Sequence, residues 1–152
     1  MVSYRMITDR KNDKSAVFST EIIDNFVDVE AVDNITNEDA SAESFSYDVN
    51  NVFYKIIRRE MPATIIKENA NFIAFRDIFP QAKHHILCIP KAQYINFTHL
   101  AIANPQLMHE MTTFILYVVQ ELKITNYKLL TNCGAGAGQI VMHFHMHIMS
   151  DD

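Results

Sequence analysis

The chain of 152 residues has no tryptophan, only three glycines and only two cysteines. Cys88 and Cys133 are too few for a disulfide framework, and neither belongs to a Cys-x-x-Cys pair, so a reducing compartment such as the cytoplasm fits best. No uncharged apolar run approaches the roughly 20 residues that a membrane span requires. The first residues also lack the apolar stretch of a secretory signal. We therefore expect a cytoplasmic protein without a membrane partner.

Charged residues are also sparse, at 20% of the chain, and the formal net charge is -5. Residues 20–48 carry nine acidic and no basic side chains, whereas residues 49–152 are nearly neutral. This change predicts an acidic, solvated and disordered N-terminal extension over residues 1–46 and a folded domain over residues 47–152. Partial packing of the extension on the domain is the alternative. Because Lys and Arg are not clustered, an obligate nucleic-acid partner is not expected.

The spacing of apolar residues in the domain predicts two helices and about five strands. The first helix begins near Val52 and is predicted to end at Met61, because proline follows. The second covers residues 106–122, with Asn104 as its N-cap and Pro105 at its first position. Short links between the elements favour an α+β fold with a mainly antiparallel sheet. The predicted strands cover residues 64–67, 72–77, 85–89, 127–131 and 140–149.

Three histidines, His143, His145 and His147, alternate with apolar residues in the last predicted strand. Because side chains alternate faces along a strand, the three imidazoles are predicted to share one face. All three glycines lie just before them, in GAGAGQ at residues 134–139, and such a loop exposes backbone N–H groups that can hold a phosphate. A metal site is the alternative. However, same-face positions on one strand are roughly 6–7 Å apart, which does not suit one tetrahedral ion.

The sequence HFHMHIM resembles the His-φ-His-φ-His-φ-φ signature, with φ an apolar residue, of the histidine triad superfamily of nucleotide hydrolases and transferases. Residues 52–91 resemble the purine-nucleoside-binding half of its Hint-like branch, and FRDIFPQA favours that branch over the Fhit-like one. The resemblance covers roughly residues 49–150. It implies a five-stranded mainly antiparallel sheet with two helices, a two-fold homodimer, a purine nucleotide ligand of the AMP or GMP type, and no cofactor or metal.

The resemblance also implies roles for individual residues. His145 is the expected nucleophile, and His143, His147 and His85 are expected to orient it and to assist proton transfer. A nucleophilic imidazole forms a covalent nucleotidyl intermediate and so divides one difficult displacement into two easier ones. The other expected nucleotide-binding residues are Asp77 for the ribose hydroxyls, Asn132, Gly138, Gln139, Ile140 and Val141 around the phosphate, and the apolar purine clamp of Val52, Phe53, Ile56, Phe75 and Ile78.

Each of these roles has a structural alternative. The apolar clamp residues are also what a hydrophobic core would contain, and Asp77 and Asn132 are also suited to turns. Ile140 departs from the family, which usually has a serine there that donates a hydrogen bond to the phosphate or leaving group. Losing one such donor can cost a few kcal/mol of transition-state stabilisation.

The implied function is hydrolysis of purine nucleoside 5′-phosphoramidates or related adenylates without a metal. A nucleotide-binding scaffold or regulatory protein with weak turnover is one alternative, and Ile140 favours it. A dinucleoside polyphosphate hydrolase is the other alternative.

Overall fold

The structure, a computed structural model, describes residues 46–152. The expected extension over residues 1–46 lies outside the described residues, apart from its last residue. Within residues 46–152, no helix is long and apolar enough to cross a bilayer. The elements, in chain order, are α1 (Val52–Ile57), β1 (Ile65–Glu68), β2 (Phe72–Arg76), β3 (His84–Pro90), α2 (Phe97–Ala103), α3 (Pro105–Glu121), β4 (Lys128–Leu130), the 3-10 helix η3 (Ala135–Ala137) and β5 (Met146–Ser150).

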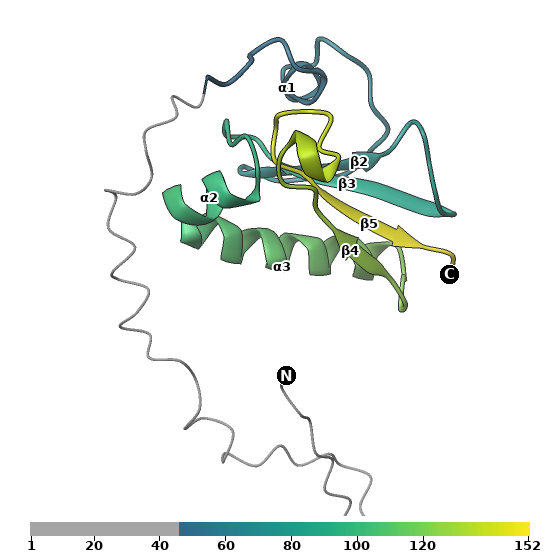
Figure 1. The fold of residues 1–152 in the computed structure, drawn as a ribbon. Coiled ribbons are helices and arrows are strands. Elements are labelled where there is room, and N and C mark those ends of the chain that lie inside the picture. The colour runs from purple at the N-terminus through teal and green to yellow at the C-terminus, as the bar shows by residue number, and fades with distance from the viewer. Residues whose placement is uncertain (1–45) are drawn as a thin grey trace, which may run out of the picture. The chain divides into compact units, whose positions relative to one another are not determined.

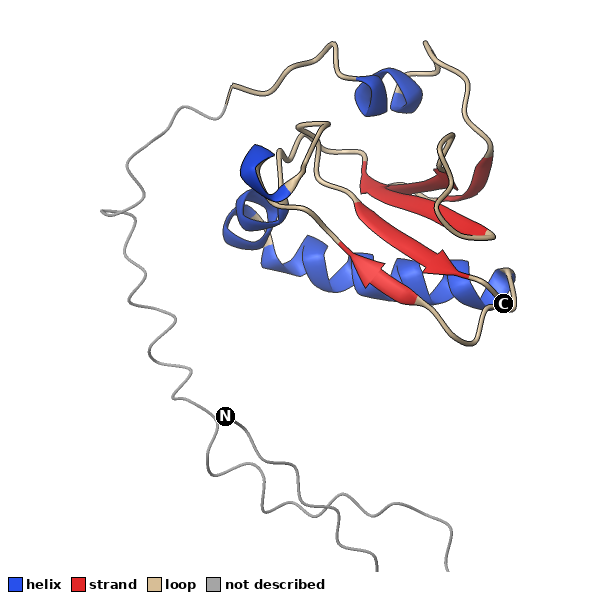
Figure 2. Ribbon diagram, turned by 45° about the vertical axis from the view of Figure 1, so that its right-hand side comes forward, coloured by secondary structure: helices blue, strands red, loops and turns tan. Residues whose placement is uncertain are grey.

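The strands form one five-stranded sheet in the order β1-β2-β3-β5-β4, and every neighbouring pair is antiparallel. Helices α2 and α3 lie along one face of the sheet, and α1 lies over the opposite face (Figures 1 and 2). The predicted α+β architecture is therefore confirmed.

Strands β2 and β3 are covered on both faces, which explains their continuous apolar runs. Alternate side chains enter two buried clusters. The helix-side cluster lies between the sheet and α3, and the α1-side cluster lies beneath α1. The helix-side cluster includes Phe72, Ala74, Ile86, Cys88, Met111, Phe114, Val118, Phe144 and Ile148, and the α1-side cluster consists of Phe53, Ile56, Ile73, Phe75, Leu87 and Ile89.

The start of α3 follows the sequence prediction. Asn104 accepts a hydrogen bond from the backbone N–H of Leu107, and Pro105 is the first helical residue. Helix α2 was not predicted from the sequence. It has seven residues, too few for the helical spacing of Phe97, Leu100 and Ala101 to distinguish it from a loop, and its cap, Asn96, is an ordinary turn residue.

The last strand begins later than predicted. A strand was expected over residues 140–149, but β5 starts at Met146. The neighbouring β3 ends in Pro90, which has no N–H to extend the ladder. Instead, the N–H of Phe144 donates to the carbonyl of Tyr94 at 2.6 Å. The first two histidines of the motif therefore precede the strand rather than lie on it.

Helices α1 and α3 both end without a glycine at the position where helices often have one. The first helix ends at Ile57, earlier than predicted, and Arg59 after it has a φ of 64°. Lys123 after α3 has a φ of 56°, and the N–H of Ile124 closes the turn on the carbonyl of Val119 at 2.9 Å. These are Schellman caps, in which glycine usually occupies the left-handed position. Here a basic side chain occupies it in both helices.

We expect Lys123→Gly to stabilise the protein. The left-handed conformation costs a residue with a side chain about 1–2 kcal/mol, whereas the extra freedom of glycine in the unfolded chain costs about 0.5–1 kcal/mol. The free energy of unfolding should therefore rise by about 0.5–1 kcal/mol, measured by urea denaturation. Lys128→Gly, in the exposed strand β4, is the matched control and should lower stability. A lower midpoint for Lys123→Gly would contradict this account of the cap.

Candidate active site

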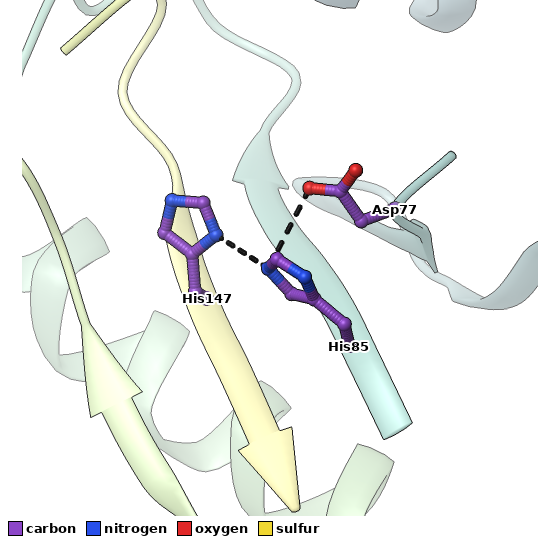
Figure 3. A group of neighbouring side chains, drawn as sticks. All are labelled: Asp77, His85 and His147. Atoms are coloured by element: carbon purple, nitrogen blue, oxygen red, sulfur yellow. Dashed lines mark hydrogen bonds and ion pairs between the residues drawn. The ribbon is translucent and has the colours of Figure 1, made fainter. Parts of the chain in front are cut away.

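Asp77, His85 and His147 meet on the α1-side face of the sheet (Figure 3). His85 lies on β3 and His147 on β5, where they are diagonal neighbours, since His147 pairs with Leu87 and His85 with Met149. Nε2 of His85 is 2.8 Å from Nδ1 of His147. Asp77 follows β2, and its N–H donates to the carbonyl of His85 at 2.9 Å. The sheet register thus brings together three residues that are distant in sequence.

The backbone determines which nitrogen of each ring carries the proton. The N–H of Gln81 donates to Nδ1 of His85 at 3.1 Å, so the proton of His85 is on Nε2. That proton points to Nδ1 of His147, and Oδ2 of Asp77 lies 3.5 Å from the same Nε2. His147 therefore accepts at Nδ1 and keeps its own proton on Nε2. Burial lowers the pKa of His147 to about 4, so the ring is neutral at neutral pH.

The ring of His145 is held in one neutral tautomer. Its Nδ1 lies 2.7 Å from the carbonyl oxygen of His143, which can only accept, so Nδ1 carries the proton and Nε2 has a free lone pair. Burial lowers the pKa of His145, which keeps the ring unprotonated. The hydroxyl of Thr131 donates to the carbonyl of His145 at 2.8 Å and fixes the backbone there. This arrangement is the one that an attacking imidazole needs.

His143 is fully buried and lies behind His145. Its Nε2 donates to the carbonyl of Pro90 at 2.8 Å, and its Nδ1 is hydrogen-bonded to the hydroxyl of Tyr47. Burial lowers the pKa of His143 to about 4. Both ring nitrogens of His143 thus have hydrogen-bond partners inside the protein.

The alternation of the histidine motif persists although the strand starts late. Phe144 and Ile148 belong to the helix-side cluster. On the other face, the ring of Phe53 lies edge-on to His145, with 5.1 Å between the ring centroids. The prediction that the imidazoles share one face is therefore confirmed, but not the prediction that a regular strand carries all three.

The glycine loop is braced from inside. Gly134 and Gly138 have φ angles of 86° and 84°, the left-handed region in which residues with side chains are strained. The buried side chain of Gln139 accepts from the N–H of Gly134 at 2.8 Å and donates to the carbonyls of Ile95 and Val141 at 2.6 and 3.0 Å. Gln139 was expected to be one of the nucleotide-binding residues around the phosphate. Because all its polar atoms are used within the protein, it shapes the loop instead.

The segment that follows the glycine loop offers backbone hydrogen-bond donors. Among the described residues, none accepts a hydrogen bond from the backbone N–H groups of residues 140–143. Three of these N–H groups, on Ile140, Val141 and Met142, belong to exposed or half-buried residues and are suited to hold an anion, whereas His143 is fully buried. The side chain of Ile140 is 91% exposed and offers no donor. Nδ2 of Asn132 donates to the carbonyl of Ala137 at 2.6 Å, so it also stabilises this loop.

The residues of the apolar clamp differ in burial. Phe53, Ile56 and Phe75 are buried in the α1-side cluster, which confirms the core alternative for these three residues. Val52 is partly buried against that cluster, as is Val141, which was expected around the phosphate. Ile78 is 78% exposed, outside the cluster, and belongs to the loop that follows Asp77.

Sequence reasoning missed the partners that act through the backbone or from a distance. These are the N–H of Gln81 and the carbonyl of Pro90, together with the hydroxyls of Tyr47 and Thr131. Every residue has a backbone C=O, and every residue except proline has a backbone N–H. No residue pattern therefore marks a contact made by these groups. The two hydroxyls had no motif around them that could have singled them out.

The donor atoms of Asp77, His85 and His147 are better placed to bind a cation than the sequence predicted. The sequence argument against a metal site considered only ligand positions along a single strand. Asp77, His85 and His147 instead come from three places in the sheet, and one donor atom from each lies within 4.8 Å of the others. Two imidazoles and a carboxylate are ligands that zinc accepts. In this structure the same atoms form the hydrogen bond between His85 and His147.

Comparisons with known proteins agree with this geometry. Residues 58–152 match the HIT domain. An uncharacterised HIT-like protein of Helicobacter pylori is 51% identical over 104 residues, which are 67% of this chain and 97% of that protein. The solved structure of a HIT family hydrolase from Clostridium thermocellum is 40% identical with a TM-score of 0.64, and the match covers 68% of this chain and 91% of that one.

A histidine triad nucleotide-binding protein from Candida albicans has the same fold, with 29% identity and a TM-score of 0.61 over 67% of this chain and 76% of that one. The HIT domain match covers more than half of the chain and includes all three histidines of the motif. The chain therefore belongs to the HIT family.

Proposed function

We propose that this chain is a nucleotide hydrolase of the Hint-like branch that cleaves purine nucleoside 5′-phosphoramidates or related adenylates through a nucleotidyl-His145 intermediate. The observation that carries the proposal is the hydrogen bond from Nδ1 of His145 to the carbonyl of His143, which leaves Nε2 as the nucleophile. The histidine triad relatives named as a hydrolase and as a nucleotide-binding protein support the general class. The cytoplasmic location expected from the sequence is part of the same proposal.

In the first step, Nε2 of His145 attacks the α-phosphorus and the P–N bond breaks. The leaving nitrogen takes one proton from a water molecule and departs as an amine, and the resulting hydroxide remains. The Nε2–H group of His147 donates a hydrogen bond to the departing group. The nucleotidyl group is then bonded to Nε2, and the Nδ1–H of His145 stays on the carbonyl of His143, which stabilises the positive charge of the substituted ring.

In the second step, the hydroxide attacks phosphorus and the bond to Nε2 breaks, which releases a nucleoside monophosphate and restores neutral His145. The backbone N–H groups of residues 140–142 are proposed to bind the phosphoryl oxygens in both steps. Asp77, at the end of β2, is proposed to accept hydrogen bonds from the ribose hydroxyls, as acidic residues do in other nucleotide folds. The net reaction consumes one water.

Binding with weak turnover is a second candidate function. Ile140 lacks the hydroxyl that relatives usually offer to the phosphate or leaving group, and its exposed side chain offers no substitute. The loss of one donor slows the chemical step more than it weakens nucleotide binding.

The proposal predicts that His145→Ala abolishes turnover of adenosine 5′-phosphoramidate but keeps AMP binding. Removing a covalent nucleophile should lower kcat by at least about a thousand-fold, whereas Asp77 and the loop remain in place. Initial rates and calorimetric AMP titration would measure the two effects. His109→Ala, an exposed histidine on α3, is the matched control and should keep the wild-type rate. Wild-type activity in His145→Ala would rule out this nucleophile, and slow turnover by the wild-type protein would favour the binding function.

The same assay distinguishes a metal-dependent reaction. A cation held by Asp77, His85 and His147 would displace the proton between the two imidazoles. We expect dialysis against EDTA to leave the rate unchanged, because the proposed steps use only imidazole, water and backbone donors. Loss of activity on chelation, with recovery on adding Zn²⁺, would contradict the proposed mechanism.

The pH dependence follows from the burial of His145. Only the neutral ring can attack, so activity should fall as the pH drops through the pKa of His145. Because burial lowers this pKa below the ordinary histidine value of about 6.5, the midpoint of the acid limb should lie below pH 6.5. Measurement of kcat/KM between about pH 4 and 8, with circular dichroism to follow folding, tests this. A midpoint at or above pH 6.5 would contradict the proposed environment of His145.

We also propose that the chain forms a two-fold homodimer. Strand β4 is an edge strand with exposed Leu129 and Leu130, and Leu116 and Tyr117 of α3 are 49% and 54% exposed. Exposed edges and apolar side chains of this kind are usually covered by a partner. We expect light scattering at micromolar concentration to give twice the 17.5 kDa chain mass. Leu116→Glu should give the monomer, and Ile102→Glu on α2 should not; a wild-type monomer would contradict the proposal.

A further inference from the structure

We propose that Tyr47 is a positioning residue of the active site, which acts through His143 on the nucleophile His145. The inference rests on the proposed role of His145 as nucleophile. Tyr47 precedes residues 58–152, the segment that matches the HIT domain, so the family match does not include it. It lies 96 positions before His143 in the sequence, and the fold returns it to the histidine motif.

The direction of the contact follows from the other bonds of His143. Its Nε2 donates to the carbonyl of Pro90, so in the neutral ring Nδ1 has only a lone pair and must accept. The hydroxyl of Tyr47 is therefore the donor. Burial raises the pKa of Tyr47 above its usual value, so the phenol keeps its proton at neutral pH. The two rings also meet edge-on, with 5.6 Å between their centroids.

The contact reaches His145 through one residue. The backbone carbonyl of His143 accepts the Nδ1–H of His145 at 2.7 Å, so the position of His143 determines the orientation and the tautomer of the nucleophile. Tyr47 and Pro90 hold the ring of His143 from its two nitrogens. Without the tyrosine hydroxyl, a fully buried ring would have an unsatisfied acceptor, which favours a shift of the ring and of its backbone.

The contacts of Tyr47 argue against a purely structural role. Tyr47 belongs to neither buried cluster of the described domain. Its hydroxyl is hydrogen-bonded to His143 and to the side chain of Asn51, and its ring meets that of Tyr54, whose centroid is 5.5 Å away. Removing the hydroxyl alone, as in Tyr47→Phe, keeps the ring contacts and deletes the hydrogen bonds of the hydroxyl, to His143 and to the side chain of Asn51.

The experiment is Tyr47→Phe in the full chain, with Tyr54→Phe as the matched control. Tyr54 lies in the same group of rings, but its hydroxyl accepts from the amide of Gln93 at 2.8 Å and meets no histidine. The first readout is the ¹⁵N NMR signal of His143 Nδ1, together with the exchange rate of the Nδ1 proton of His145. We expect Tyr47→Phe to move the His143 signal toward the value of an unbonded imine nitrogen and to speed the His145 exchange. Tyr54→Phe should change neither.

The second readout is the kinetics of adenosine 5′-phosphoramidate hydrolysis. Tyr47→Phe should lower kcat about three- to ten-fold with KM nearly unchanged, because one hydrogen bond that orients the nucleophile is lost while the binding groups remain. Unchanged kcat, or unchanged ¹⁵N signals, would overturn the role of Tyr47. If the wild-type protein does not hydrolyse the substrate, the proposed function fails, and the NMR measurements still decide whether Tyr47 holds His143 and His145.

Discussion

The site depends on one hydrogen bond, from Nδ1 of His145 to the backbone carbonyl of His143. A carbonyl oxygen can only accept, so this contact selects one tautomer and leaves Nε2 free. The irregular segment before β5 makes the contact possible, because in a regular strand that carbonyl would face a neighbouring strand rather than the side chain two residues later. The late start of β5, imposed by Pro90 at the end of β3, is therefore part of how the site is built.

Burial favours the neutral form of the histidine rings of the motif. The pKa values of His143, His145 and His147 are all lowered, chiefly by burial, so the rings are neutral at neutral pH. Neutral imidazoles each have one donor and one acceptor, and here both positions of His143 and His85 are assigned by fixed partners. The result is a set of rings with defined proton positions. A protonated ring would lose an acceptor and break one of these bonds, so the arrangement and the lowered pKa values support each other.

The sheet supplies the rigid base for this arrangement. Strands β2 and β3 are buried on both faces, and the register of β3 with β5 places His85 beside His147. Tight packing between α1 and α3 leaves the strands little freedom to slide, because a shift of one residue would exchange the two clusters. The glycine loop has its own brace in Gln139, whose side chain joins Gly134 to two carbonyls. His85 and His147 therefore lie on strands that are fixed by the core.

The sequence by itself determined the five-stranded antiparallel architecture, the start of α3 at Asn104 and the common face of the histidines, because apolar period, caps and alternation are local properties of the chain. It also carried the family resemblance. The proton positions of the rings, the brace role of Gln139, the late start of β5 and the contact of Tyr47 with His143 were decided only by the tertiary structure. The physical reason is that these features depend on backbone groups and on side chains far apart in sequence, which no local pattern records.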